Sequence, residues 1–337
     1  MKIRTIFTVL IFVLLGTLTN SCERFVPACP IYSTPPNSED LSPGSFILTL
    51  GPTRDKREVI LHIPPLYDPN GQFPLLIVFH GGGQNAAGIR EFTGLDAAAD
   101  NYGFMVAYPN GSGRPGSEQL SWNAGYCCGY AQENNIDDVG FTEALIDFFI
   151  SHYPIDPDRI YLTGLSNGGM MAYRAGAELA DQVAGIAPVA GSLGGQLVEG
   201  GEIIMPDIPT SPVAVMAFHG MKDERVLYQG GISNPEKSPV SLDPRSDISV
   251  TDSIGFWVGA NGCDGQPSEK TLKDGTVIID RYQNCLGNAD VVLVTLVNGC
   301  HQWPSTALGS QAAQSPSDGV CANQMMLEFF LVHPKQR

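Results

Sequence analysis

The sequence is short of positive charge. Its 337 residues include 19 Lys and Arg against 35 Asp and Glu, which gives a formal net charge of −16. Proteins that bind nucleic acid neutralise phosphates with clustered Lys and Arg, so this balance excludes nucleic acid as an expected partner. An acidic, solvated surface keeps a protein soluble, and we expect the acidic excess to have that role.

Other signatures are missing as well. The eight cysteines form no C-x-x-C pair and no Cys/His cluster with zinc spacing, so the sequence predicts no metal site. The body of the chain contains no repeat or low-complexity segment, and its scattered Gly and Pro indicate many loops. With 43% hydrophobic residues, the chain can bury a large core, and we expect one domain over residues 45–337.

The N-terminal segment has the pattern of an export signal. A basic start, an apolar stretch over 6–15 and a polar, small-residue stretch lead to Cys22. This order is typical of a secretory signal and is short for a membrane span. We predict a signal peptide over 1–22 and a Pro- and Ser-rich arm over 23–44. Ordinary cleavage nearby and a lipoprotein-type anchor on Cys22 both stay open, so the protein is expected to be secreted or held at the cell envelope.

The body of the chain alternates apolar strands with helical patterns, which predicts an α/β fold. We expect a mostly parallel central sheet with helices on both faces. Residues 45–50 and 57–64 alternate in part and are expected to pair antiparallel at one edge of this sheet. Residues 89–103 have the pattern of one helix that ends at Gly103.

The segment "GLSNGGM" carries the first candidate catalytic residue. Gly164-x-Ser166-x-Gly168 follows the apolar strand "RIYLTG" and precedes a helical pattern. A nucleophile elbow needs this context, because a strained turn between strand and helix lifts the serine hydroxyl above the sheet. The backbone N–H groups at the start of the helix can then stabilise a developing oxyanion. We therefore predict that Ser166 is a nucleophile.

A glycine loop, "HGGGQNA", follows the strand "LLIVF". Hydrolases of this type place an oxyanion-hole N–H in the loop after an early strand, and Gly82 is our first candidate for it. His80 is expected to hold the loop in place. Because this loop has neither the G-x-G-x-x-G spacing nor a Walker lysine, the sequence does not favour phosphate binding there.

A serine nucleophile needs a base and an acid, which follow it in the order acid, then histidine, in this type of fold. Asp223 lies in the loop after the apolar strand "PVAVMAF", and His301 follows the strand "VVLVTLVNG". Loops at the carboxyl edge of a parallel sheet are where sites form, so we predict Asp223 as the acid and His301 as the base. The rivals are Glu224 beside the acid, the weaker Asp243, Asp247 and Asp252, His333 past the last helix, and His219, which we interpret as a strand end.

Export makes disulfides the default state of the cysteines. Cys263 and Cys285 flank a hairpin-like segment and are the favoured pair. Cys127 and Cys128 are adjacent, so a vicinal disulfide and a bridge to Cys29 both stay open.

Several of these segments together resemble a known family. "HGGGQNA", "SWNAGYCCG", "NNIDDVGFTEALID", "GLSNGGMMAYR", "FHGMKDERV" and "GCHQWP" are similar to the polyhydroxybutyrate (PHB) depolymerase-like esterases, which overlap with the feruloyl and acetyl xylan esterases of family 1 of the carbohydrate esterases. The resemblance implies an α/β-hydrolase fold and no cofactor. It also implies a triad of Ser166, Asp223 and His301, with the N–H groups of Asn167 and the Gly82 region as the oxyanion hole.

The resemblance has one departure. Relatives usually have glycine where this chain has Cys300, and Cys321 is also unusual, so we expect these two cysteines to form a disulfide that pins the loop of His301. Trp122 and Trp303 lie near the inferred active-site loops and are candidates to stack on a substrate.

We therefore expect an exported, monomeric serine carboxylic-ester hydrolase whose partner is an ester on a polysaccharide or polyester. A feruloyl esterase-like activity on plant cell-wall polysaccharide is favoured, and a PHB or polyester depolymerase or an acetyl xylan esterase is the alternative. A non-catalytic carbohydrate-binding lipoprotein is the alternative of a different class. Contact with a membrane is expected only through a lipid anchor on Cys22.

Overall fold

The structure is a computed structural model that describes residues 45–50, 56–197, 200–232, 245–272, 275–304 and 320–336. The predicted signal peptide over 1–22, the arm over 23–44 and the candidate anchor Cys22 lie outside the described residues. Within the described ranges, no helix has both the length and the apolar character that a membrane span requires.

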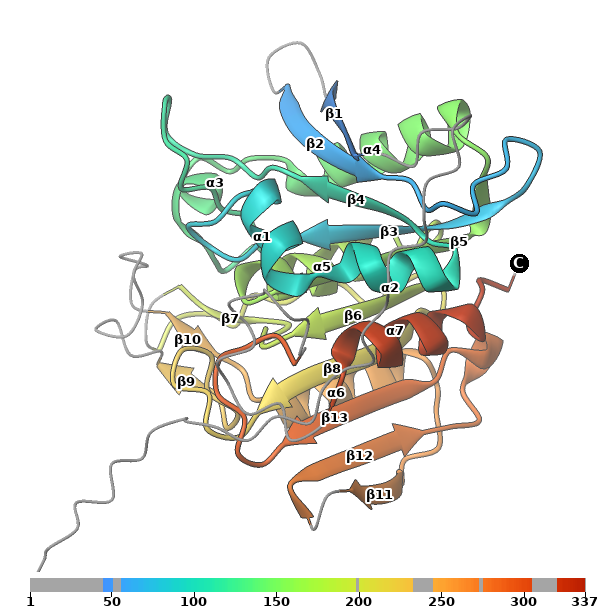
Figure 1. Ribbon diagram of the computed structural model, residues 1–337. Coiled ribbons are helices and arrows are strands. Elements are labelled where there is room, and N and C mark those ends of the chain that lie inside the picture. Colours follow the sequence, from blue (N-terminus) through green and yellow to red (C-terminus); the bar gives the residue numbers. More distant parts are fainter. Residues whose placement is uncertain are drawn as a thin grey trace, which may run out of the picture.

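A ten-stranded sheet forms the centre of the molecule (Figure 1). Its strands follow the order β1-β2-β4-β3-β5-β6-β8-β13-β12-β11, and all neighbours from β4 to β13 are parallel. The strands are β1 (Ser45–Leu50), β2 (Arg57–His62), β3 (Phe73–Phe79), β4 (Met105–Pro109), β5 (Ile155–Leu165), β6 (Gly185–Val189), β8 (Ala214–Gly220), β11 (Ser268–Leu272), β12 (Val277–Tyr282) and β13 (Val291–Leu296). This arrangement confirms the predicted α/β class with a mostly parallel sheet.

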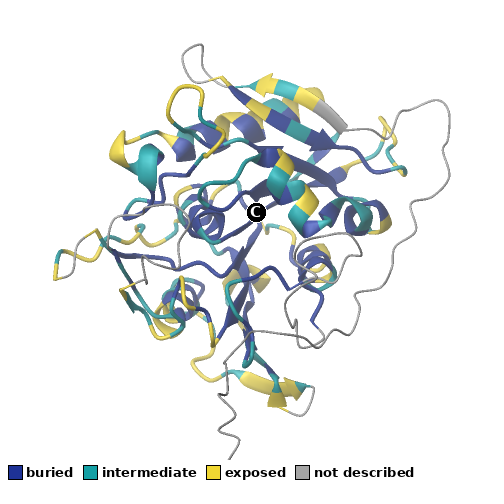
Figure 2. Ribbon diagram, turned by 60° about the vertical axis from the view of Figure 1, so that its left-hand side comes forward, coloured by how far each residue is buried: buried dark blue, intermediate teal, exposed yellow. Residues whose placement is uncertain are grey.

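Antiparallel strands close both edges of this sheet. At one edge β1 pairs with β2, and β2 pairs with β4, which confirms the antiparallel N-terminal edge. At the other edge β11 and β12 form a hairpin against β13. The central strands are buried, whereas the outermost strand β11 is exposed and β12 is largely half-buried (Figure 2). A separate small sheet joins β7 (Gly195–Gln196), β10 (Ser246–Asp247) and β9 (Gly231–Ile232).

Helices cover both faces of the central sheet. One apolar core lies under α4, α5 and α6, and a second lies under α1, α2 and α7. Every side chain of β3 is buried, and its successive residues alternate between the two cores because side chains of a strand point to opposite faces. The helices are α1 (Ala86–Thr93), α2 (Leu95–Tyr102), α3 (Gly129–Glu133), α4 (Asp138–His152), α5 (Asn167–Glu178), α6 (Val250–Ala260) and α7 (Ala322–Leu331).

The single helix predicted over 89–103 is wrong in one respect, because the structure has two helices there. Gly94 adopts a left-handed conformation with φ 58° and donates its N–H to the carbonyl of Arg90, which ends α1 immediately before α2 begins. The predicted stop at Gly103 is confirmed, since this residue has φ 72° and caps α2.

Candidate active site

Ser166 occupies the turn between β5 and α5. Its φ of 58° and ψ of −121° are strained for a residue with a side chain, and the backbone is fixed there by a hydrogen bond from the Ser166 N–H to the carbonyl of Val189 at 2.9 Å. The flanking glycines are needed for space. A Cβ on Gly164 would lie 2.6 Å from the carbonyl oxygen of Phe79, and one on Gly168 would overlap the same atom. The turn therefore has the tight strand–turn–helix geometry of a nucleophile elbow.

The glycine loop after β3 presents one free backbone donor toward this turn. The N–H groups of Gly81, Gly83 and Gln84 donate to the Gln84 side chain, the Leu120 carbonyl and the Gly81 carbonyl, at 3.1, 2.8 and 3.1 Å. The N–H of Gly82 donates to no described residue. Gly82 faces the first residue of α5, because a Cβ placed on it would lie 3.6 Å from Cβ of Asn167.

Asn167 supplies the second free donor. As the first residue of α5, its N–H has no partner within the helix, and no other described residue accepts from it. Its side chain is occupied, since Nδ2 donates to the Trp122 carbonyl at 2.9 Å and Oδ1 accepts from the Trp122 N–H at 2.8 Å. The Gly82 and Asn167 N–H groups are thus available to bind an oxyanion at the start of a helix.

His80 holds the glycine loop, as expected. The Gly111 N–H donates to its Nε2 at 2.9 Å, so Nδ1 carries the proton and donates to the Gly81 carbonyl at 2.8 Å. Burial is the main reason that the pKa of His80 falls to about 4, and the nearby Arg57 lowers it further against the opposing effect of the Gly81 hydrogen bond. His80 is therefore neutral and has a structural role.

Asp223 follows β8 and is buried within a full set of hydrogen bonds. Its Oδ1 accepts from the backbone N–H groups of Arg225 and Val226 at 2.8 and 2.9 Å, and its Oδ2 lies 2.8 Å from Nδ1 of His301. Burial raises the pKa of this carboxyl, but the charges and hydrogen bonds of His301 and His219 outweigh burial and hold the pKa well below its ordinary value. Asp223 is therefore an anion.

His301 follows β13 and is half-buried. Because the Asp223 carboxylate can only accept, Nδ1 of His301 carries the proton and Nε2 is left as an acceptor, which is the tautomer that a general base needs. Ser166, Asp223 and His301 come directly after or shortly after parallel strands β5, β8 and β13, whose carboxyl ends meet at the same edge of the sheet (Figure 1).

The rival acids and bases are exposed, are bonded to other partners or lie at the other end of the sheet. Glu224 is exposed, Asp247 is paired with Arg245 at 2.9 Å, and the Asp252 carboxylate accepts from the hydroxyl of Ser249, the N-cap of α6. His333 lies 3.6 Å from Asp290, which precedes β13 and therefore belongs to the opposite end of the sheet. Asp243 lies outside the described residues.

The predicted substrate contacts of Trp122 and Trp303 are wrong for this structure. Trp122 is 0% exposed and donates from Nε1 to the His80 carbonyl, and Trp303 is 1% exposed and donates to Oδ1 of Asn323. Neither indole offers a face to a ligand. Both rings pack and anchor the loops beside the site, because burying a large aromatic side chain with a satisfied N–H stabilises the fold.

The six cysteines of the described residues are all disulfide-bonded. Cys263 is joined to Cys285, and Cys127 is joined to its neighbour Cys128. Cys300 and Cys321 each take part in a disulfide, and their pairing with one another stays a prediction.

Two contributors to this site were not predicted from the sequence. His219, interpreted as a strand end, places its Nε2 3.4 Å from Oδ2 of Asp223 while donating to the Val226 carbonyl at 2.8 Å. The four-residue spacing of "HGMKD" across one turn is the signal that could have shown it. Arg57 pairs with the buried Asp138, which also accepts from the Asn123 N–H at 2.6 Å, and a separation of 81 residues gives no local signal for this pair.

Comparisons with known proteins show the family of this chain. The sequence model of the family "Esterase PHB depolymerase" matches residues 59–197. A protein of Nocardia uniformis subsp. tsuyamanensis named "Putative esterase NocK" is 30% identical over 293 residues, which cover 84% of this chain and 78% of NocK. The chain belongs to the esterase PHB depolymerase family. The matched range includes Gly82 and Ser166 and ends before Asp223 and His301.

Two further similarities bear on this family membership. Feruloyl esterase B of Piromyces equi is 33% identical over 245 residues, which cover 73% of this chain but only 42% of that enzyme. The structure of an acetyl xylan esterase from Aspergillus awamori superposes with a TM-score of 0.52 at 14% identity and covers 77% of this chain and 94% of that one. At this identity the structural likeness supports the α/β-hydrolase fold alone.

Proposed function

We propose that this member of the PHB depolymerase esterases is an exported serine carboxylic-ester hydrolase. The observation that carries the proposal is the pair of Asp223 and His301, oriented with Nε2 free, at the same sheet edge as the strained elbow of Ser166. A helix start and a glycine loop with two free N–H groups, at Asn167 and Gly82, complete the set of groups that acyl transfer requires.

The mechanism follows from these groups. Nε2 of His301 removes the proton of the Ser166 hydroxyl as its oxygen attacks the ester carbonyl, and Asp223 stabilises the imidazolium that forms. The carbonyl oxygen becomes an oxyanion that accepts from the N–H groups of Gly82 and Asn167. The imidazolium then protonates the leaving alcohol, and water, activated by the same histidine, hydrolyses the acyl-enzyme.

The substrate that we favour is a feruloyl or related ester on plant cell-wall polysaccharide. The similarity to feruloyl esterase B supports this substrate. The expected export of this acidic chain, with net charge −16, supports it as well, because a cell-wall polymer lies outside the cytoplasm and is reached only by an exported enzyme. A PHB or other polyester depolymerase is the second candidate, which the matching family model favours.

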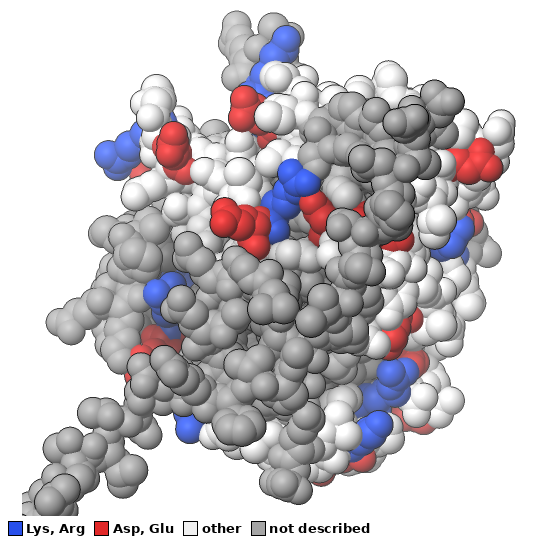
Figure 3. Space-filling view, viewed as in Figure 1, with Lys and Arg blue, Asp and Glu red and all other residues white. Residues whose placement is uncertain are grey.

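The distribution of charge on one face of the molecule does not favour a polyanionic partner. On the face shown in Figure 3, the Lys and Arg side chains of the described residues are scattered among Asp and Glu rather than gathered in a patch. A neutral polymer fits this distribution better than nucleic acid does.

The decisive experiment is Ser166→Ala, assayed with p-nitrophenyl acetate. We expect hydrolysis to be abolished while the circular dichroism spectrum is unchanged, since the nucleophile is lost and the alanine side chain is smaller than serine. Undiminished hydrolysis would rule out Ser166 as the nucleophile, whereas no hydrolysis by the protein with Ser166 intact would favour a non-catalytic binding protein. A panel of methyl ferulate, acetylated xylan and PHB film then separates the substrate classes by kcat/KM.

A further inference from the structure

A cavity lies beside the candidate active site, on the far side of the loop after β3. It has a volume of about 1250 Å³ and opens at the ends of β2 and β4. Its walls come from β1 and β2, from the loops after β3 and β4, and from α3, α4 and the turn between these two helices. Ser166, Asp223 and His301 are not among its described lining residues. Nothing in the proposed acyl-transfer mechanism uses this cavity.

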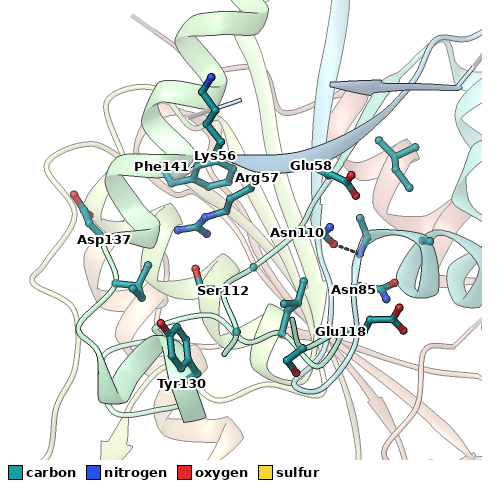
Figure 4. Close-up of a pocket in the computed structure, with 18 of the residues that line it drawn as sticks. Lys56, Arg57, Glu58, Asn85, Asn110, Ser112, Glu118, Tyr130, Asp137 and Phe141 are labelled. Atoms are coloured by element: carbon teal, nitrogen blue, oxygen red, sulfur yellow. Dashed lines mark hydrogen bonds between the residues drawn. The ribbon is translucent and has the colours of Figure 1, made fainter. Parts of the chain in front are cut away.

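The lining offers neutral groups that can hydrogen-bond. Figure 4 shows Arg57 and Phe141 on one side, Tyr130 on the opposite side and Ser112 between them. The hydroxyls of Ser112 and Tyr130 bond to no described residue, and both side chains are half-buried. Two free hydroxyls that face a common cavity can each donate to and accept from a ligand.

Two amides extend this surface along the cavity. Oδ1 of Asn110 accepts from the Ala86 N–H at 2.7 Å, and Oδ1 of Asn85 accepts from the Gly88 N–H at 2.9 Å. These bonds fix both amide groups and leave their Nδ2 atoms without a described acceptor. Fixed amide donors beside free hydroxyls suit a ligand rich in hydroxyl groups, because each ligand hydroxyl both donates and accepts.

The charges of the lining disfavour an anion. Three carboxylates line the cavity, from Glu58, Glu118 and Asp137. Lys56 contributes one positive charge. The remaining cation, Arg57, is paired with Asp138 and packs its guanidinium 4.1 Å from the centre of the Phe141 ring. The cavity therefore carries an excess of negative charge and fits a neutral ligand.

The cavity shares a wall with the candidate oxyanion hole. Asn85 and Leu120 both line it, and Leu120 accepts from the Gly83 N–H and forms a β-bridge with Gln84. One face of the loop over 81–85 thus borders the cavity while Gly82 faces Asn167. We propose that this cavity binds the neutral polysaccharide chain that carries the ester, so that the polymer is held next to the reacting group. This inference rests on the proposed function.

The test measures polysaccharide binding without catalysis. In a Ser166→Ala background, the double variant Ser112→Ala/Tyr130→Phe removes the two free hydroxyls with minimal change of shape. The matched control, Tyr102→Phe/Ser268→Ala, makes the same changes on α2 and β11, outside the cavity. Affinity electrophoresis in gels with soluble, ester-free xylan gives the dissociation constant, and gels with polygalacturonate give the response to a polyanion.

We expect xylan to retard the parent protein more than polygalacturonate does. The cavity variant should bind xylan about tenfold more weakly, as expected for the loss of two hydrogen bonds, and the control should change by less than about twofold. No retardation of the parent by xylan, equal retardation of the cavity variant, or stronger binding of the polyanion would each overturn the proposal.

Failure of the proposed function gives a different result. With Ser166 intact, the double variant Ser112→Ala/Tyr130→Phe should hydrolyse p-nitrophenyl acetate at the wild-type rate, because this small ester does not extend into the cavity. If the wild-type protein does not hydrolyse that ester, the esterase assignment fails. Xylan binding that depends on Ser112 and Tyr130 would still support the cavity as a polysaccharide site.

Discussion

The serine and the histidine of the candidate site are held in place by different means. Main-chain packing fixes Ser166, because the glycines on either side of it leave no room for a Cβ against the carbonyls of β3. Side chains fix His301, because its Nδ1 bonds to the Asp223 carboxylate and the preceding residue, Cys300, takes part in a disulfide. One half of the site therefore depends on shape, and the other half depends on hydrogen bonds and charge.

This difference determines how each half should fail. A close-packed backbone has no way to accommodate an added atom, so a small steric change on the serine side should disrupt the fold itself. A hydrogen-bonded acid can be replaced by an isosteric amide without a steric conflict, so a change on the histidine side should disrupt chemistry and leave the fold intact.

The largest effect is expected for Gly168→Ala. The new methyl group would overlap the carbonyl oxygens of Phe79 and His80, so we expect either no folded protein or a loss of more than about 4 kcal/mol of unfolding free energy in urea titrations. Gly259→Ala is the control, because Gly259 is exposed on α6 and a Cβ added to it would meet no atom within 4 Å, and it should change stability by no more than about 1 kcal/mol. Equal stability of the two variants would contradict the role of backbone packing at Ser166.

The next effect is expected for Asp223→Asn. An amide that accepts through Oδ1 from two N–H groups presents its Nδ2 to His301, which favours the wrong imidazole tautomer, so kcat should fall roughly 10³–10⁴-fold while the protein stays folded. Rates on p-nitrophenyl acetate measure this. Glu224→Gln makes the same chemical change at the adjacent exposed position and should leave kcat within about twofold. If the two variants lose activity equally, Asp223 does not have the special role that its contacts suggest.

The same difference explains which parts of the structure the sequence predicts. Backbone constraints leave a glycine pattern that is visible in "GLSNGGM" and "HGGGQ", and apolar runs show the parallel strands directly. The choice of Asp223 and His301 also follows from chain order, because the residues that end parallel strands meet at one edge. Gly94 is harder to interpret, since a glycine between two helical patterns can be tolerated within one helix or can end it.

Contacts between distant side chains leave no local signal. Nothing near Arg57 indicates that it pairs with Asp138, because the partner lies 81 residues away at the start of α4 and only the folded structure brings β2 and α4 together. The prediction of Trp122 as a substrate contact is wrong for the same reason. Its position on a loop near the site is visible in the sequence, but its burial depends on β3 and on the Asn167 side chain that binds its backbone.

The smallest expected effect is on the pH dependence of the unfolding free energy, which tests whether neutral His80 holds the glycine loop of the oxyanion hole. Folded His80 has a pKa of about 4 against an ordinary value of 6.5, so the unfolded chain binds a proton first as the pH falls. Stability from the neutral imidazole is therefore complete above the ordinary pKa and is lost between about pH 6.5 and pH 4, a loss of about 3 kcal/mol on going from pH 7 to pH 4. His80→Gln cannot bind this proton, so its unfolding free energy, measured by urea titration across that range, should fall by about 3 kcal/mol less than that of the parent. Parallel pH profiles for the two proteins would show that folding does not lower the pKa of His80, which would contradict its role as a buried, neutral acceptor for the Gly111 N–H.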